Sequence, residues 1–400
     1  MRPIIFLIAI CSLILPSQLL AGEQEADSQP SEPNIVMLIS DDQAWNDYSF
    51  MGHQHVETPS LDRLAKQSVL FRRGYVPTSL CRPSLMTIIT GRYAHQHGVT
   101  GNDPSLKYAK RGSEEHTARR AELIKFVDRY DTLPRRLSAA GYLCFQTGKW
   151  WEGSPQQGGF TSGMTRGFPQ RGGRHGDDGL KIGREGIEPI TTFIDDAVKQ
   201  KKPFFLWYAP FMPHTPHQPP KRLFEKYKQM RSGQDGNLLN ERVAKYYAMC
   251  EWFDETCGAV LKQLDDLDIA DDTIIVYVCD NGWIQNPEAN GYGPRSKQTP
   301  FEGGVRTPIM FRWPGKWKPA DRKELCSSID LMPTLLTAVG QEPPSGVPGL
   351  DLTRALADGS PIKRDTIFGE GFAHDIADLN DPEAVSYTHL TLPTKTNACR

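Results

Sequence analysis

Two pairs of polar residues directly follow apolar runs and carry side chains that can ligate a metal. Asp41-Asp42 follows the run 34–40, and Asp280-Asn281 follows the run 273–279. Such apolar, partly β-branched runs are typical of strands buried on both faces of a sheet. In open α/β sheets, ligands bind at the carboxyl ends of the strands. Four hard oxygen donors there predict a Ca²⁺ or Mg²⁺ site, although each pair alone is also a common turn sequence.

One cysteine differs from the others in its surroundings. Cys81 is followed by Arg82-Pro83-Ser84, in a stretch of turn and cap residues. The eight cysteines are dispersed and form no CxxC pair, which argues against a zinc ribbon and against a disulfide framework. Most of them are predicted to be buried small hydrophobic residues. Cys81 is therefore the candidate for chemistry.

Alternating strands and helices must position these side chains. Strands are predicted at 34–40, 204–209, 273–279 and 307–313. Thr58-Pro59-Ser60 opens one helix, and a second runs from about 240 to 264. This alternation predicts the α/β fold class, with a large, mostly parallel mixed sheet between helix layers.

The composition excludes several classes of protein. The chain has 400 residues, of which 38% are hydrophobic and 24% charged, so a wholly disordered, collagen-like or coiled-coil protein is excluded. Lys and Arg number 46 against 48 Asp and Glu, a net charge of −2. Because proteins that grip a nucleic-acid backbone carry a basic excess, no nucleic-acid partner is expected.

The N-terminus has the pattern of an export signal. A positive start, an apolar run from Ile4 to Leu15 and a small-residue exit predict a signal peptide over 1–21. An N-terminal membrane anchor is the alternative, but the run is short for a spanning helix. The mature chain is expected in the periplasm or outside the cell, with no stable membrane span after cleavage. Residues 22–33 are polar and predict a flexible leader.

The last stretch does not continue the pattern of the chain. From Val385 the sequence reads VSYTHLTLPTKTNACR, with neither helical nor strand periodicity. Its first ten letters resemble the translation of an adapter used in sequencing libraries. Residues 385–400 are therefore predicted to be an assembly artefact.

Eight segments, in order, resemble the sulfatase family of the alkaline-phosphatase-like superfamily. They span 33 to about 340, so the resemblance implies a catalytic domain over 34–345, with a C-terminal subdomain that begins at 346–384 and is truncated. The segments are PNIVMLISDD (33–42), ETPSLDRLAKQSVLF (57–71), CRPSLMTIITGR (81–92), GYLCFQTGKW (141–150), APFMPHTPH (209–217), DNG (280–282), KQTPFEGGVRTPIMFRWPG (297–315) and SSIDLMPTLL (327–336).

The resemblance implies a covalent mechanism at Cys81. That position matches the cysteine that a formylglycine-generating enzyme converts to formylglycine. One hydroxyl of the hydrated aldehyde attacks sulfur and expels the alcohol, and the other later expels sulfate and restores the aldehyde. The maturation enzyme is therefore an expected partner.

The remaining site residues are assigned by the same resemblance. Lys149 and Lys297 match lysines that hold sulfate oxygens, and His214 matches the histidine beside the leaving oxygen, with His217 the less favoured alternative. The cation is expected to be Ca²⁺, with Mg²⁺ as the alternative. The implied metal ligands are Asp41, Asp42, the modified Cys81, Asp280 and Asn281.

Two positions depart from the family pattern. Leu85 stands where the family has an arginine that supports formylglycine and is read during maturation, and leucine supplies neither charge nor donors. Arg82 is nearby, but its direction is open. Trp151 replaces the histidine of the usual GKWH, and the sequence names no substitute for it.

Three functions remain open at this point. The leading one is a metal-dependent sulfuric ester hydrolase acting on a sulfated glycan or an aryl sulfate. A phosphonate or phosphate ester hydrolase of the same superfamily is the first alternative. A glycan-binding pseudo-sulfatase is the second, if Leu85 blocks the modification of Cys81.

Overall fold

The computed structural model describes residues 32–107, 109–233, 236–376, 378–379 and 388–393. The predicted signal peptide 1–21 lies outside the described residues, as do all of the leader 22–33 except its last two positions and all of 385–400 except 388–393. Within the described ranges, no helix is long and apolar enough to cross a membrane.

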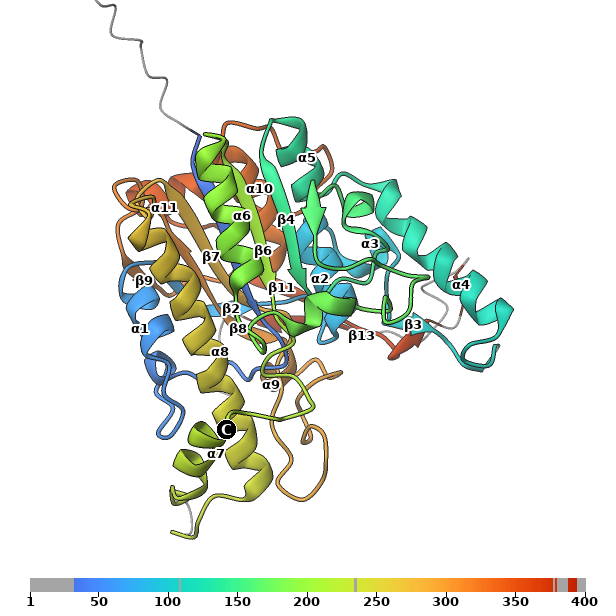
Figure 1. Cartoon of the computed structure of the whole chain (residues 1–400), viewed down its shortest axis with the longest axis vertical. Helices are drawn as coiled ribbons and strands as arrows, with labels where there is room; N and C mark the ends of the chain where they lie inside the picture. The colour runs from blue at the N-terminus through green and yellow to red at the C-terminus, as the bar shows by residue number, and fades with distance from the viewer. Residues whose placement is uncertain (1–31, 108, 234–235, 377, 380–387, 394–400) are drawn as a thin grey trace, which may run out of the picture. The chain divides into compact units, whose positions relative to one another are not determined.

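A nine-stranded mixed sheet forms the centre of the fold (Figure 1). Strand β1 (Asn34–Ser40) lies between β6 (Phe204–Ala209) and β7 (Thr273–Cys279), and both pairings are parallel. Only β8 (Arg306–Arg312) runs antiparallel to its neighbours, β7 and β2 (Val69–Tyr75). The prediction of a mostly parallel mixed sheet is confirmed. The strand order is β10-β2-β8-β7-β1-β6-β4-β5, with β9 paired to β2; the remaining strands are β4 (Leu143–Gly148), β5 (Ser162–Gly163), β9 (Ala320–Arg322) and β10 (Cys326–Ser327).

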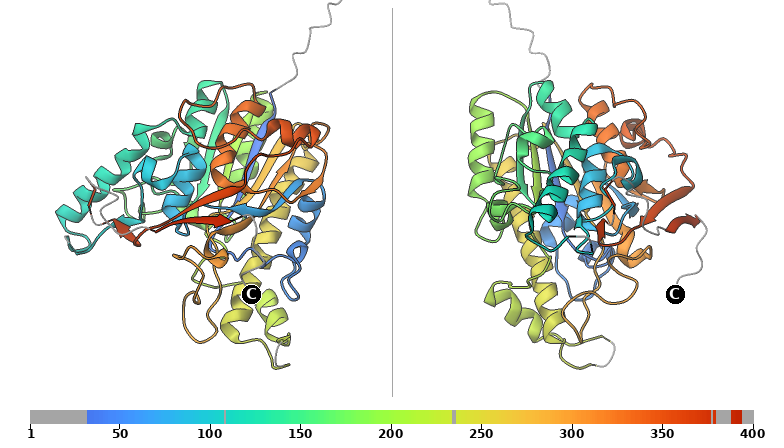
Figure 2. Two further views of the ribbon diagram at one scale, coloured as in Figure 1. Left: turned by 180° about the vertical axis from the view of Figure 1, so that it is seen from behind. Right: turned by 90° about the vertical axis from the view of Figure 1, so that its right-hand side faces the viewer.

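Helices cover both faces of the sheet, as the side view in Figure 2 shows. Successive side chains of β1 point to opposite faces, so both faces must be covered. Ile35 and Met37 pack into one core cluster, and Val36 and Leu38 pack into another. The first cluster takes residues from α2 (Cys81–Thr90), α5 (Leu133–Ala139) and α10 (Leu331–Ala338); the second takes residues from α1 (Pro59–Lys66), α6 (Glu188–Lys199) and α8 (Glu241–Asp266).

The predicted elements lie where the sequence places them. Strands β1, β6 and β7 have the predicted bounds, whereas the strand predicted at 307–313 is β8, one residue earlier. The helix predicted from about 240 is α8, which begins after Asn240 because that side chain accepts a hydrogen bond from the Arg242 amide. The other α-helices are α3 (Ala94–His97), α4 (Glu114–Ile124), α7 (Lys221–Lys228), α9 (Glu302–Val305) and α11 (Thr353–Asp358); the 3₁₀ helices are η1 (Ser49–Met51), η2 (Lys125–Arg129), η3 (Pro155–Gly158), η4 (Asp177–Lys181) and η5 (Ser328–Asp330).

The C-terminal part adds two small sheets. Strand β12 (Asp375–Ile376) pairs with β3 (Asp103–Pro104), and β11 (Thr366–Gly371) pairs with β13 (Thr388–Pro393). The expectation of no regular element in 385–400 is therefore wrong for 388–393, because a backbone ladder forms without apolar periodicity. The foreign origin of 385–400 and the boundary at 345 stay predictions.

Candidate active site

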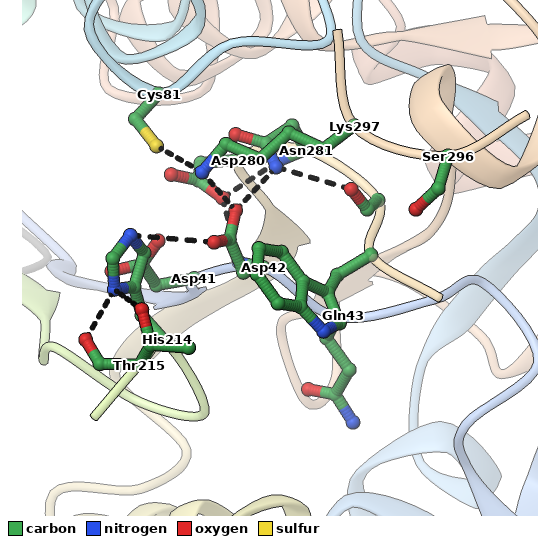
Figure 3. A network of polar contacts seen from close by, with 12 residues as sticks. Asp41, Asp42, Gln43, Cys81, His214, Thr215, Asp280, Asn281, Ser296 and Lys297 are labelled. Atoms are coloured by element: carbon green, nitrogen blue, oxygen red, sulfur yellow. Dashed lines mark hydrogen bonds and ion pairs between the residues drawn. The ribbon is translucent and has the colours of Figure 1, made fainter. Parts of the chain in front are cut away.

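The ends of β1 and β7 bring the four predicted oxygen ligands to one edge of the sheet (Figure 3). Ser40 is paired with Cys279, so the residues that follow leave the sheet side by side. Asp42 adopts a left-handed φ of 62°, which Asp tolerates better than most residues. In this turn the Asp42 amide donates to Asp280 Oδ1 at 3.1 Å. The turn thus joins the two strand ends directly.

One oxygen on each of these four side chains is buried and accepts no hydrogen bond from the described residues. A buried oxygen without a partner costs free energy, and a hard cation can satisfy several of them together. Burial also raises the pKa of Asp41 and Asp280, which a cation would reverse. The set therefore fits Ca²⁺ or Mg²⁺. The four atoms are Asp41 Oδ2, Asp42 Oδ2, Asp280 Oδ2 and Asn281 Oδ1.

Two buried ammonium groups flank this acidic set. Lys149 Nζ donates to Asp41 Oδ1 at 2.7 Å, and Lys297 Nζ donates to Asp42 Oδ1 at 2.6 Å. Burial lowers the pKa of both lysines, but the neighbouring carboxylates more than offset it, so both pKa values lie above the usual one. Both lysines are therefore charged at neutral pH.

The position of Lys149 depends on a glycine. Gly148 has a φ of 77°, and a Cβ there would lie 1.8 Å from the carbonyl oxygen of Ala209 on the neighbouring strand. Only glycine permits this conformation and this approach together. At this close approach of the two strands, the Lys149 amide donates a hydrogen bond of 2.8 Å to the Ala209 carbonyl.

Cys81 is the first residue of α2 and faces the lysines. Its Sγ accepts a hydrogen bond of 3.0 Å from Lys297 Nζ, and the residue is only 1% exposed. Burial raises the pKa of the Cys81 thiol to about 12, in spite of Lys149 and Lys297. The thiol is therefore protonated at neutral pH and is a weak nucleophile as it stands.

His214 completes the group from the loop after β6. Its Nε2 lies 3.3 Å from Asp42 Oδ2, and its Nδ1 lies 2.6 Å from the carbonyl oxygen of Thr215. Burial and the two lysines hold the pKa of His214 well below its usual value. Since a carbonyl only accepts, Nδ1 carries the proton and Nε2 of the neutral ring presents a lone pair to Asp42. Ligand atoms of Asp41, Asp42, Cys81 and His214 all lie within 4.8 Å of one another.

Comparison with known proteins identifies the family of the chain. A sequence model of the sulfatase family matches residues 33–341. The chain belongs to the sulfatase family. Human N-acetylgalactosamine-6-sulfatase is 29% identical to it over 403 residues, covering 91% of this chain and 73% of that protein. Human arylsulfatase A is 28% identical over 394 residues, covering 84% of this chain and 70% of that protein.

Solved structures agree with this membership. Ps i-CgsB in complex with k-i-k-neocarrahexaose superimposes with a TM-score of 0.68 at 25% identity, covering 86% of this chain and 80% of that one. The chain is thus a sulfatase enzyme with the α/β fold of its family, as the sequence motifs predict.

The position that lacks the family arginine lies in the apolar core of this sulfatase. Leu85 is 5% exposed and belongs to the same apolar cluster as Val76 and Met86. Arg82 does not replace the missing arginine, because its guanidinium pairs with Glu152: Nε lies 2.7 Å from Oε1, and Nη2 lies 2.6 Å from Oε2. The open question of the direction of Arg82 is thereby answered.

Trp151, which stands where the family pattern has a histidine, lies beside another histidine. The Trp151 ring is 3% exposed and lies 5.4 Å from the His175 ring, centroid to centroid. Lys149 Nζ lies 5.1 Å from the Trp151 centroid. Burial, followed by Lys149, lowers the pKa of His175 to about 3. Because Trp151 is almost fully covered, it offers no open face for stacking on a sugar.

Sequence reasoning missed several residues around the site. Glu152 and His175 belong to no motif that it used. Trp283 directly follows the Asp280-Asn281-Gly282 motif, and its ring centroid lies 5.7 Å from Lys297 Nζ and 6.4 Å from the His214 ring. An aromatic residue directly after a ligand motif was the available signal for Trp283.

Proposed function

We propose that this sulfatase hydrolyses sulfate esters of a glycan, using formylglycine made from Cys81 and a bound Ca²⁺ ion. One observation supports the proposal above others: four buried oxygens that accept no hydrogen bond from the described residues lie beside two buried ammonium groups and one cysteine. The oxygens suit a hard cation, and the ammonium groups suit an anionic ester.

The proposed metal ligands are Asp41, Asp42, Asp280, Asn281 and the modified side chain of Cys81. A bound Ca²⁺ ion, or Mg²⁺ as the alternative, would polarise the sulfate group and favour an ionised nucleophile. Formylglycine would supply a hydrated aldehyde, which is a nucleophile that the cysteine thiol, with its raised pKa, is not.

Lys149 and Lys297 are proposed to hold the sulfate oxygens. Each ammonium is anchored by one carboxylate oxygen, which fixes its position while leaving other N–H donors for the ester. Fixed positive groups stabilise charge that develops on the transferring sulfuryl group without reorganisation.

His214 is proposed to donate a proton from Nε2 to the leaving alcohol oxygen. The Thr215 carbonyl orients the ring through Nδ1, so Nε2 is the atom that faces the site. A bound anionic ester favours the protonated ring and thereby opposes the lowering of its pKa by burial.

A glycan is proposed as the substrate because the named relatives point that way. One curated relative is an N-acetylgalactosamine-6-sulfatase, and one similar structure is a complex with a neocarrahexaose. We also propose that the protein is exported to the periplasm or the medium, because polymeric glycans occur outside the cell.

The test combines mass spectrometry and kinetics on the protein expressed in its native host. We expect the peptide containing Cys81 to carry formylglycine, and the protein to turn over 4-nitrophenyl sulfate faster than the matching phosphate and phosphonate esters. A Cys81→Ala variant should lose this turnover, whereas exposed Lys316→Met should keep it. Formylglycine with faster phosphonate turnover would favour the phosphonate hydrolase instead. An unmodified Cys81 without turnover would favour a glycan-binding pseudo-sulfatase.

A further inference from the structure

A pocket of about 710 Å³ opens directly beside the candidate active site. Its size falls within the range of about 300–1,000 Å³ that is usual for pockets holding small molecules. Three segments line it: the loop after His214, the first turns of α8, and the loop between Asn281 and Lys297. The lining residues are Thr215, Pro216, His217, Glu241, Arg242, Lys245, Gln285, Asn290 and Gly291.

Two of these three segments also carry candidate catalytic residues. Thr215 directly follows His214, and its carbonyl orients the His214 ring. Gln285 accepts a hydrogen bond of 3.1 Å from Trp283 Nε1. The Trp283 ring centroid lies 5.7 Å from Lys297 Nζ and 6.2 Å from the ring of the pocket residue His217. The pocket is therefore next to the His214 side of the site, where the alcohol would leave.

The polar groups of the pocket favour an anion. Arg242 is held by bonds from Nε to Asn290 Oδ1 at 3.1 Å and from Nη1 to the Pro287 carbonyl at 3.3 Å. Among the described residues, its Nη2 has no hydrogen-bond partner. Lys245 Nζ donates to Glu241 Oε1 at 2.6 Å, so these two charges offset each other. Arg242 remains as the net positive charge, already oriented by the loop that it contacts.

We propose that this pocket binds a second sugar unit of the substrate, next to the sulfated one, and that this unit is acidic. The inference rests on the proposed function. An acidic unit means a sugar that bears a carboxylate or a second sulfate, either of which a guanidinium recognises with paired N–H donors. Asn290 adds an amide group suited to sugar hydroxyls, whereas the Gln285 amide is already bonded to Trp283 and Asn286.

The first two residues of α8, Glu241 and Arg242, carry opposite charges, so neutralising each should have opposite effects on the binding of an anion. Arg242→Gln removes the positive charge, and Glu241→Gln removes the neighbouring negative one at nearly constant size. Arg231→Gln is the matched control, because Arg231 is an arginine outside the pocket whose Nη1 donates to the Gly236 carbonyl.

Two measurements test the inference. Calorimetry measures the binding of chondroitin 6-sulfate oligosaccharides, their carboxyl-reduced forms and carrageenan oligosaccharides, and kinetics measures turnover of 4-nitrophenyl sulfate, which has no second ring. For the acidic oligosaccharides, we expect Arg242→Gln to weaken binding by about 10-fold or more, since the variant removes a charge-assisted hydrogen bond. Glu241→Gln should tighten it several-fold, and Arg231→Gln should leave it unchanged. None of the three should change kcat/KM for 4-nitrophenyl sulfate.

The panel also distinguishes the sources of the negative charge. Loss of the Arg242 effect on carboxyl reduction would assign the pocket to a carboxylate, and an effect with carrageenan oligosaccharides would assign it to a second sulfate. Equal binding by wild type and Arg242→Gln, or no binding of any acidic oligosaccharide, would overturn the inference. If Cys81 is unmodified and 4-nitrophenyl sulfate is not hydrolysed, the proposed function fails, while the binding measurements still decide the role of the pocket.

Discussion

Arg82 and Glu152 form a two-point ion pair inside the protein, with donor–acceptor distances of 2.7 and 2.6 Å and both side chains at most 3% exposed. Arg82 follows Cys81 on α2, and Glu152 lies three residues after Lys149. The pair therefore joins the helix that carries the candidate nucleophile to the loop that follows Lys149, the proposed sulfate-binding lysine. Asn102 supports the same helix end, because its Oδ1 accepts from the Arg82 amide at 3.1 Å.

Breaking this pair should destabilise the protein strongly. Glu152→Gln leaves a buried guanidinium without its counter-charge, which typically costs about 3–5 kcal/mol. Urea denaturation should show that loss, and the double variant Arg82→Met/Glu152→Met should lose less than the sum of the single variants. The exposed pair Arg222–Glu255 is the control, and Arg222→Ala should cost at most about 1 kcal/mol. Equal losses for the buried and exposed pairs would contradict the prediction.

Placing the arginine of the family pattern at position 85 should destabilise this protein. The Leu85 side chain is 5% exposed in an apolar cluster, and Glu152 is already paired with Arg82. Leu85→Arg would bury an unpaired charge, so we expect a loss of several kcal/mol in the free energy of unfolding. Leu85→Met, which conserves volume, should cost less than about 1.5 kcal/mol. A Leu85→Arg protein as stable as wild type would show that the site holds a counter-charge for it.

Lys297 should matter for turnover more than for folding. Lys297→Met keeps the length of the side chain but removes the donor to Asp42 and Cys81. Loss of one such fixed group typically lowers kcat by about 10²–10³. Turnover of 4-nitrophenyl sulfate measures this, with exposed Lys316→Met expected to match wild type. A kcat within twofold of wild type for Lys297→Met would exclude Lys297 from the reaction.

Metal removal should lower the stability of the folded protein. A ligand that binds only the folded state at 100 times its Kd contributes about 2.7 kcal/mol. We therefore expect a chelator to lower the Tm and added Ca²⁺ to restore it. Asp280→Ala should abolish the response to Ca²⁺, whereas Asp266→Ala, on the exposed end of α8, should retain it. A Tm that is insensitive to chelation and to Ca²⁺ would argue against a resident cation.

His97 should make the fold sensitive to acid. Its Nδ1 accepts from the Val99 amide at 3.1 Å, and burial lowers its pKa from 6.5 to about 3. The unfolded chain binds a proton below pH 6.5 while the folded chain does not, so stability falls as the pH drops from 6.5 toward 3, by about 1.4 kcal/mol per unit. His97→Asn keeps an acceptor but cannot titrate, so denaturation curves from pH 7 to 4 should show a shallower decline. Parallel declines for both proteins would refute this role.

The sequence by itself determined the central strands of the sheet and the places of the candidate metal ligands after them. Apolar runs, β-branched in β1 and β7 and aromatic in β6, specify the bounds of these strands, because a strand buried on both faces must be apolar throughout. The parallel pairing of β1 with β7 then requires Asp41-Asp42 and Asp280-Asn281 to leave the sheet at one edge. The family motifs point to Cys81, and in the structure its Sγ accepts a hydrogen bond from Lys297 Nζ.

Only the tertiary structure decided what surrounds those residues. Arg82 pairs with Glu152, 70 positions away in the sequence. His175 packs beside Trp151 and belongs to a loop whose sequence has no regular pattern. The pocket beside His214 draws its walls from three segments between residues 215 and 291. Local patterns report which face of an element is apolar, because burial repeats with the period of the backbone. Contacts between loops have no such period, and so they emerge only when the whole chain is packed.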